Sequence, residues 1–188
     1  MNIFYLDTDP AKAAQYMADR HVVKMILESA QLLSTAHRVL DGQMQETKRL
    51  VSGTEDKYRK HTIWVLPDER QDVMYLATHR NHPSAIWIRE RVENYLWLVD
   101  HFFALMEEYT FRYGKHHATK KIGYYLQSPP FNLKDYEFTP PPSAMDSKYI
   151  ISDDPVINYR NYYINGKSHL HKWTKREQPD WMVTNVED

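Results

Sequence analysis

The chain has 188 residues, of which 42% are hydrophobic and 13% aromatic, and this length and composition fit one domain with a sizeable core. Its formal net charge of −1 gives no overall attraction to DNA or to an anionic membrane, so any nucleic-acid site must be a local basic patch. There is no cysteine, which excludes disulfides, thiolate metal sites and cysteine nucleophiles.

The first part of the chain predicts two helices and a loop. Residues 1–6 are β-branched and aromatic and suit a strand or an extended arm. The Asp-Pro pair at 9–10, followed by alanines, predicts a short first helix. We expect Asp19 to cap a second helix over about 20–39. Residues 41–61 are polar and contain two glycines, which predicts a loop with at most a helical turn.

The second part predicts two further helices. Apolar residues recur with helical periodicity over about 84–113, and Gly114 is a typical stop signal. Residues 128–143 contain five prolines and must be extended. The Asp-Pro pair at 154–155 predicts a last helix that reaches about 173.

These elements predict a mainly α, compact single-domain fold with long proline-rich connections. We expect its helical core over about 9–115 and a basic, aromatic C-terminal segment over about 154–182. No signal peptide is visible and no apolar run approaches the ~20 residues that span a bilayer. A soluble, cytoplasmic protein without membrane contact, and a monomer, is therefore expected.

A polar stripe on the second predicted helix is the strongest candidate site. His21, Lys24, Glu28, Gln31 and Thr35 fall within roughly 80° of the helix surface at about 100° per residue. Apolar residues fill most of the remainder, so the helix can be packed on several sides while the stripe lines a cleft. The alternative is a solvated stripe with an ordinary salt bridge.

The chemistry of this stripe makes Glu28, Lys24 and His21 the candidate catalytic residues. Lys24 and Glu28 are four residues apart and can touch. A lysine held neutral is a nucleophile for Schiff-base chemistry. A carboxylate beside it can move protons or stabilise a developing oxocarbenium ion.

The histidines invite a metal interpretation, which we do not favour. His79, His82, His116 and His117 lack an HExxH-type arrangement, so we expect no metal. His82, which precedes Pro83, suits a helix cap close to bound phosphate oxygens.

Further candidates for DNA contact combine basic and aromatic residues, which suit phosphate binding and base stacking. They are Arg89, Trp87, Lys115, Arg160, Tyr162 and Lys167. The alternatives are a core position for Trp87, a surface pair with Glu93 for Arg89, and solvated charged faces for the others.

The residues 19–33, DRHVVKMILESAQLL, resemble the conserved helix of the pyrimidine-dimer DNA glycosylase family, known from the phage endonuclease V. That helix carries Asp-x-His and a Glu seven residues after the His, as Asp19, His21 and Glu28 do here. The Asn-His-Pro at 81–83, which opens an aromatic-rich helix, is similar to the family's second segment. Residues 159–167 resemble its C-terminal stretch that contacts DNA.

Bacterial members of the family are closer still. Lys24 and Gln31 match their Lys and Glu-x-x-Gln steps, and Trp87 matches a Trp near their Asn-His-Pro. The resemblance implies a DNA glycosylase, with an associated abasic-site lyase, that flips a damaged or modified base of the pyrimidine-dimer type from duplex DNA. Glu28 would be the catalytic carboxylate and His21 would hold the DNA backbone. Duplex DNA is the implied partner, and no cofactor is implied.

The chain departs from the family at the nucleophile. The phage enzyme uses the α-amine of a threonine that removal of Met exposes, whereas Asn2 does not favour that removal and the arm before His21 is longer. Lys24, the N-terminal amine and water all stay open as nucleophiles. Two other functions also stay open: a non-catalytic nucleic-acid-binding domain on the same scaffold, and an enzyme that acts on a free or modified nucleotide. The lesion and the role of residues 128–143 are not fixed.

Overall fold

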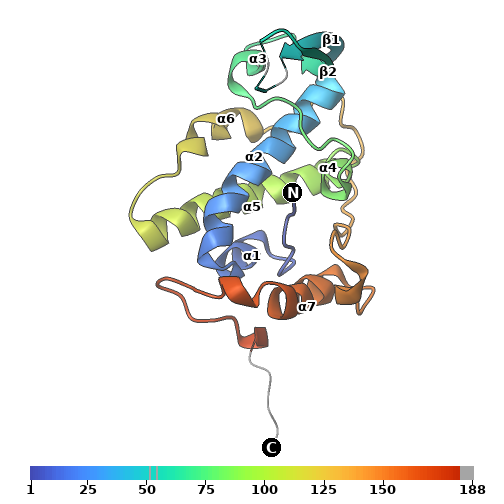
Figure 1. The fold of residues 1–188 in the computed structure, drawn as a ribbon. Coiled ribbons are helices and arrows are strands. Elements are labelled where there is room, and N and C mark those ends of the chain that lie inside the picture. Colours follow the sequence, from blue (N-terminus) through green and yellow to red (C-terminus); the bar gives the residue numbers. More distant parts are fainter. Residues whose placement is uncertain (51, 54, 183–188) are drawn as a thin grey trace, which may run out of the picture.

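The computed structural model describes residues 1–50, 52–53 and 55–182 (Figure 1). Its α-helices are α1 (Pro10–Tyr16), α2 (Asp19–Asp41), α3 (Arg70–Val73), α4 (Pro83–Trp87), α5 (Val92–Tyr113), α6 (Gly123–Leu126) and α7 (Pro155–Gly166), and its strands are β1 (Gln43–Leu50) and β2 (Tyr58–Val65). Four short 3₁₀ turns are η1 (Ala118–Ile122), η2 (Ser147–Tyr149), η3 (Ser168–Leu170) and η4 (Asp180–Met182). The mainly α prediction is confirmed, although the two-stranded sheet means that the fold is not all-α.

Local capping signals identify two helix starts correctly. Asp9 accepts hydrogen bonds from the first N–H groups of α1, and Asp154 does so for α7, each followed by proline. The prediction for Asp19 was wrong, because Ala18 occupies the N-cap position of α2. The Asp19 carboxylate instead accepts hydrogen bonds from Arg112 and Thr174. Its role is to tie distant segments together.

The long helix predicted over 84–113 is broken into α4 and α5. Arg91 is extended, with φ −143°. The N–H of Val92 donates to the carbonyl of Asp135, and the side-chain amide of Asn94 donates to the carbonyl of Trp87. Since a segment far along the chain helps to fix the break, periodicity alone could not reveal it. Gly114 ends α5 in the left-handed region, φ +68°, as predicted.

One hydrophobic core includes residues from Ile3 to Met182. Both α1 and α2 pack on α5. The first residues form a buried extended arm without strand pairing, and α7 lies against it. α7 ends at Gly166, before the predicted end at 173. Within the described part of the chain, no helix has the length and apolar character needed to cross a bilayer.

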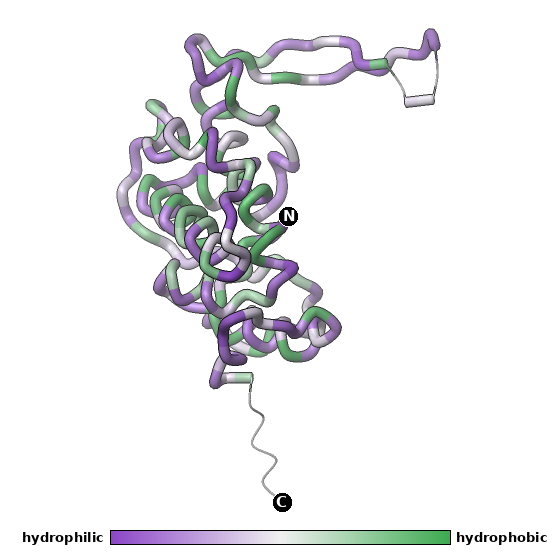
Figure 2. The backbone as a smooth tube through the Cα atoms, turned by 90° about the vertical axis from the view of Figure 1, so that its left-hand side faces the viewer, coloured by the Kyte–Doolittle hydropathy of each residue, from purple (hydrophilic) through white to green (hydrophobic). Residues whose placement is uncertain are grey.

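The loop predicted over 41–61 was wrong, because most of this stretch belongs to an antiparallel hairpin. β1 and β2 pair from Gln43 opposite Val65 to Leu50 opposite Tyr58. Almost all of β1 and the outer half of β2 are exposed. Figure 2 shows the hairpin projecting sideways from the body, on the side where the N terminus lies. With no buried face, the strands need no alternation of apolar and polar residues, which is why the pattern did not predict them.

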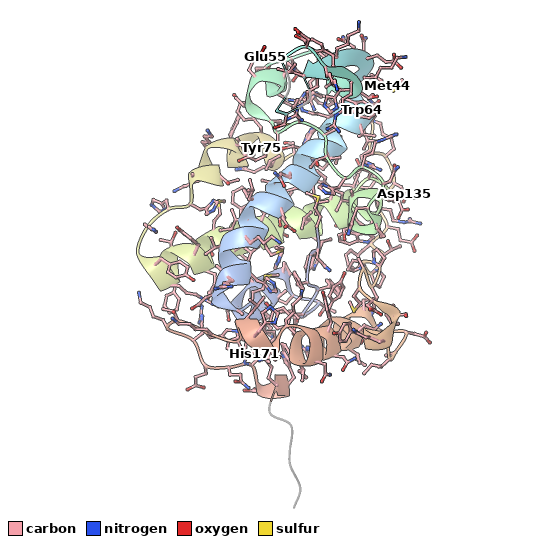
Figure 3. The ribbon with its side chains drawn as sticks, in the orientation of Figure 1. Met44, Glu55, Trp64, Tyr75, Asp135 and His171 are labelled. Carbon is pink, nitrogen blue, oxygen red and sulfur yellow. The ribbon has the colours of Figure 1, made fainter. Side chains whose placement is uncertain are left out.

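A buried arginine anchors this hairpin to the body. Arg38 is 1% exposed, and all five of its N–H groups donate hydrogen bonds. The acceptors are the carbonyls of Trp64, Gln71, Met74 and Tyr75 and the side-chain oxygen of Gln71. Figure 3 shows Trp64 at the base of the hairpin and Tyr75 in the segment that follows α3. No feature of the neighbouring sequence predicts this arrangement.

Three buried histidines predict that the fold is sensitive to acid. Burial lowers the pKa of His21 to about 3, and those of His37 and His101 to about 4. The unfolded chain binds a proton at each histidine below about pH 6.5 and the folded chain does not, so stability is full above that pH and falls as pH drops toward 4. Between pH 7 and pH 5 each histidine contributes a loss of about 2 kcal/mol.

Urea denaturation at the two pH values measures this loss. His101→Phe keeps an aromatic ring beside Trp97, although it removes the hydrogen bond to the carbonyl of Pro10. The variant should therefore be less stable at both pH values and should lose about 2 kcal/mol less between them. An unchanged pH dependence in His101→Phe would contradict the assignment.

Candidate active site

Glu28 lies on the outer side of α2, and both of its carboxylate oxygens are in contact with nitrogen atoms. Its side chain is 13% exposed. Oε1 is 3.1 Å from Nζ of Lys24, one helical turn earlier. Oε2 accepts a hydrogen bond of 3.2 Å from the backbone N–H of Asn2. The carboxylate therefore sits between an amine and the start of the chain.

The N-terminal arm is bent to reach Glu28. Asn2 donates from its side chain to the carbonyl of Ala144 and accepts from the N–H groups of Ile3 and Phe4. Phe4 has a φ of +54° and is 4% exposed. This conformation costs on the order of 1–3 kcal/mol for a residue with a side chain, so the packing around Phe4 must hold it.

His82 belongs to the same neighbourhood. Its Nδ1 accepts a hydrogen bond of 3.2 Å from the N–H of Ser84 and caps α4, as predicted. Burial lowers the pKa of His82, the N-terminal amino group and His79 act in the same direction, and Glu28 opposes them. His82 is therefore held neutral close to the carboxylate and the chain start.

A groove lies beside Lys24, the ion-pair partner of Glu28, near the start of α2. It has a volume of about 580 Å³ and lies between the start of α2 and the end of α5. Its lining residues are Asp19, Arg20, Val23, Lys24, Tyr109, Tyr113 and Lys115. Lys24, whose side chain is 67% exposed, and Lys115 bring two of the predicted residues together here.

A family model described as pyrimidine dimer DNA glycosylase matches residues 1–121. The chain belongs to this family. The family's description implies DNA as the substrate and glycosylase activity on it. The matched residues include Asn2, Lys24, Glu28, His82 and Lys115. No curated protein and no solved structure matches the chain significantly.

His21 has a packing role in this chain. It is 5% exposed, its ring stacks on Phe4 with centroids 4.2 Å apart, and its Nδ1 is hydrogen-bonded to the Tyr163 hydroxyl. Burial, reinforced by Lys167 and Lys24, lowers its pKa to about 3, so the imidazole is neutral. The expectation that it touches substrate is corrected: His21 supports the arm that leads to Glu28.

The polar stripe is also less uniform than predicted. Thr35 is fully buried at one end and His21 at the other, whereas Lys24 is exposed and Glu28 and Gln31 are half-buried. Two apolar side chains, Val23 at 40% and Leu27 at 38% exposed, stand beside it. The accessible face of α2 is therefore mixed, since part of the apolar surface expected to be buried borders the groove.

Two predicted DNA contacts form hydrogen bonds within the protein. Trp87 is 3% exposed and its indole N–H donates to the carbonyl of Thr139, so neither face of its ring is available to a base. Arg160 donates to the carbonyl of Leu6 and to the carboxylate of Asp7. Trp87 is corrected to a core position, because a sequence pattern does not distinguish a buried aromatic residue from an exposed one. The Arg160 side chain is 29% exposed, and its contact with DNA stays a prediction.

The other predicted contacts keep part of their surface. Arg89 donates to the carbonyl of Arg80, and among the described residues it forms no ion pair with Glu93. The ammonium of Lys167 lies 4.8 Å from the centre of the Tyr162 ring. Both are half-buried, on α7 and immediately after it, outside the range matched by the family model. Their contact with DNA stays a prediction.

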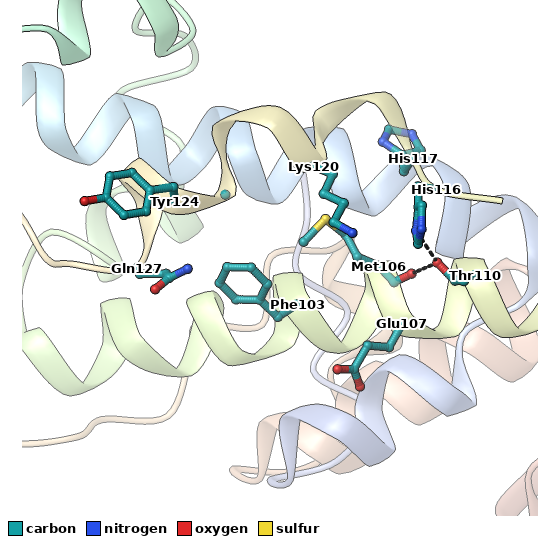
Figure 4. A pocket seen from close by; sticks show the side chains of 10 residues that line it. Phe103, Met106, Glu107, Thr110, His116, His117, Lys120, Tyr124 and Gln127 are labelled. Carbon is teal, nitrogen blue, oxygen red and sulfur yellow. Dashed lines mark hydrogen bonds between the residues drawn. The ribbon is translucent and has the colours of Figure 1, made fainter.

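A second cavity lies apart from the groove, between α5 and the η1–α6 segment (Figure 4). It has a volume of about 520 Å³ and is lined by Phe103, Met106, Lys120 and Tyr124, among others. His116 and His117 also line it, and the hydroxyl of Thr110 is hydrogen-bonded to the His116 ring. Among the described residues, no three histidine, aspartate or glutamate side chains are grouped so as to hold a metal ion.

Proposed function

We propose that the chain is a DNA N-glycosylase that acts on a damaged pyrimidine flipped out of duplex DNA, with Glu28 as its catalytic carboxylate. The observation that carries this proposal is the position of Glu28. It is largely shielded and in contact with Lys24 and with the start of the chain, and Lys24 in turn lines an open groove together with Lys115. The family description supports the same chemistry.

Cleavage of the bond between base and sugar builds positive charge on the sugar, and a fixed carboxylate stabilises that charge. Because the Glu28 side chain is only 13% exposed, little water screens it. The exposed ammonium groups of Lys24 and Lys115 are suited to phosphate oxygens of the strand that carries the flipped nucleotide. Glu28 thus acts on the sugar while the groove holds its backbone.

We assign the nucleophile of an accompanying lyase step to Lys24. Its Nζ is a primary amine 3.1 Å from Oε1 of Glu28, so after base release the carboxylate can accept its proton before the amine adds to the C1′ aldehyde of the abasic sugar. Loss of water from this adduct then gives the imine. The side chain is two-thirds exposed and can turn toward a nucleotide in the groove. The N-terminal amino group, on the other side of Glu28, and water are the competing nucleophiles.

Borohydride trapping on ultraviolet-irradiated duplex DNA tests this assignment. The wild-type chain should form a covalent adduct after reduction of the imine, and Lys24→Gln should reduce the adduct to background because an amide forms no imine. Lys115→Gln is the matched control, since it removes the same charge from the same groove and should leave the adduct in place.

Peptide mapping of the adduct separates the alternatives. An adduct on the peptide that contains Lys24 supports the assignment. An adduct that persists in Lys24→Gln and maps to residues 1–2 would transfer the role to the N-terminal amine. Base release without any adduct would indicate water as the nucleophile and leave Glu28 as the catalytic carboxylate.

A further inference from the structure

The projecting hairpin concentrates positive charge in a chain whose formal net charge is −1. Its two strands carry four lysine and arginine residues, Lys48, Arg49, Arg59 and Lys60, and a single acidic residue, Glu46. All five side chains are on the exposed part of the hairpin. The segment that connects the strands adds Glu55, Asp56 and Lys57, so the excess of positive charge lies on the strands themselves. The strands are therefore a local basic surface in a chain whose overall charge is not basic.

The register places like charges directly opposite each other. Lys48 faces Lys60 and Arg49 faces Arg59 across the two strands. Like charges at opposed positions destabilise a strand pair, and an isolated two-stranded hairpin is only marginally stable in water. Since this part of the hairpin also buries little surface, its charges do not serve folding.

The two faces of the hairpin differ in how their charge is compensated. Side chains alternate along a strand, so the lysine pair and the arginine pair lie on opposite faces. On the lysine face Lys60 forms a 3.4 Å pair with Glu46. The arginine face has no acidic residue in either strand, and Arg49 and Arg59 border a small hollow of about 270 Å³ near the end of the hairpin.

The hairpin is also held in a defined position on the molecule. Arg38 fixes the carbonyl of Trp64 in β2 to the body, and at Gly42, where α2 ends, a side chain would crowd the carbonyls of Arg38 and Val65. An eight-residue strand extends about 26 Å. In Figure 2 the arm projects on the side of the N terminus, and the start of the chain contacts Glu28. The hairpin and the start of the chain that contacts Glu28 therefore lie on the same side of the molecule.

We propose that the hairpin is a DNA-binding arm, whose Arg49 and Arg59 contact backbone phosphates of the duplex next to the nucleotide held at Glu28. This inference rests on the proposed function for the identity of its ligand. A guanidinium forms forked hydrogen bonds with phosphate oxygens, which suits two arginines that have no carboxylate on their face of the two strands. The unfavourable opposition of the two arginines is relieved when a phosphate lies between or beside them.

Equilibrium binding to a duplex oligonucleotide at several salt concentrations tests the arm. Each phosphate contact adds about 0.9 to the magnitude of the salt slope for duplex DNA. Arg49→Gln/Arg59→Gln should therefore lower the slope by about 2 and weaken binding about tenfold or more at low salt. The control Lys12→Gln/Lys134→Gln removes the same charge from exposed positions outside the hairpin and should leave the slope near that of the wild type.

Two further measurements keep the result unambiguous. The melting temperature of Arg49→Gln/Arg59→Gln should equal or exceed that of the wild type, because the substitution removes repulsion from an exposed strand pair. Base release from irradiated DNA by the wild type tests the proposed function independently. If the wild type is active and the hairpin variant binds DNA with the wild-type slope, the proposal that the hairpin binds DNA is wrong. The proposed glycosylase function is then unaffected.

The reverse outcome is equally informative. The wild type could release no base while its DNA affinity still depends on Arg49 and Arg59. This result would contradict the proposed function and support the DNA-binding role of the hairpin. If the substitution instead changes the oligomeric state in sedimentation and leaves DNA binding intact, the hairpin joins copies of the chain, and its assignment to DNA is wrong.

Discussion

Glu28→Gln is expected to reduce base release from irradiated duplex DNA roughly 10³-fold, because the amide cannot balance positive charge on the sugar or accept a proton from Lys24. The substitution keeps the shape of the side chain and one oxygen that can accept from the N–H of Asn2. Binding of the same duplex should change little, since the ligand's phosphates are held by lysine and arginine side chains. Single-turnover base release and equilibrium binding, measured on the same protein, check both statements.

The control for this experiment is Glu93→Gln, which removes a carboxylate from an exposed position in the first turn of α5. It should retain wild-type activity. The stability of Glu28→Gln should stay within about 1 kcal/mol of the wild type, because the lost ion pair involves an exposed lysine. Full activity in a folded Glu28→Gln variant would show that Glu28 is not the catalytic carboxylate.

The helices that could be predicted are those with signals in their own residues. Asp9 and Asp154 each precede a proline and cap the helices that the pattern proposed, and Gly114 adopts the positive φ that its place after α5 requires. These interactions span only a few residues. Because their energies depend little on the rest of the fold, these helix ends can be predicted from the sequence alone.

The parts that could not be predicted depend on partners far along the chain. Two segments distant in sequence meet where Asp135 accepts from Val92 at the break between α4 and α5. Arg112 is 2% exposed and pairs with Glu108 and Asp19. Arginine is mostly exposed in proteins, and nothing next to it in the sequence marks a buried one.

In the candidate site, too, local contacts could be predicted and contacts between distant segments could not. The contact between Lys24 and Glu28 follows from helical spacing and was predicted. Asn2 was missed as a neighbour of Glu28, because its position depends on the strained turn at Phe4 and on packing against Ala144. The one signal available for it was the unusual apolar and aromatic character of the first six residues, which a buried arm explains.

Arg38→Met is expected to destabilise the fold by about 3–5 kcal/mol, the largest loss we anticipate for a residue outside the site. Methionine fills most of the space but removes the hydrogen bonds to four backbone carbonyls, whereas the side-chain oxygen of Gln71 keeps the one from the N–H of Leu66. Arg38→Lys should not restore stability, because three donors on a single nitrogen cannot reach acceptors arranged around a planar fork. Urea denaturation at pH 7 measures both variants.

Arg59→Met is the matched control, since it removes the same side chain from an exposed position of the hairpin and should change stability by less than about 0.5 kcal/mol. Because Nη1 of Arg38 holds the carbonyl of Trp64, its loss should also free β2 from the body. Hydrogen exchange under conditions where Arg38→Met remains folded should then be faster in the hairpin amides than in α5 relative to the wild type. A stability loss below about 1 kcal/mol, or uniform exchange throughout the chain, would show that the hairpin is anchored by other contacts.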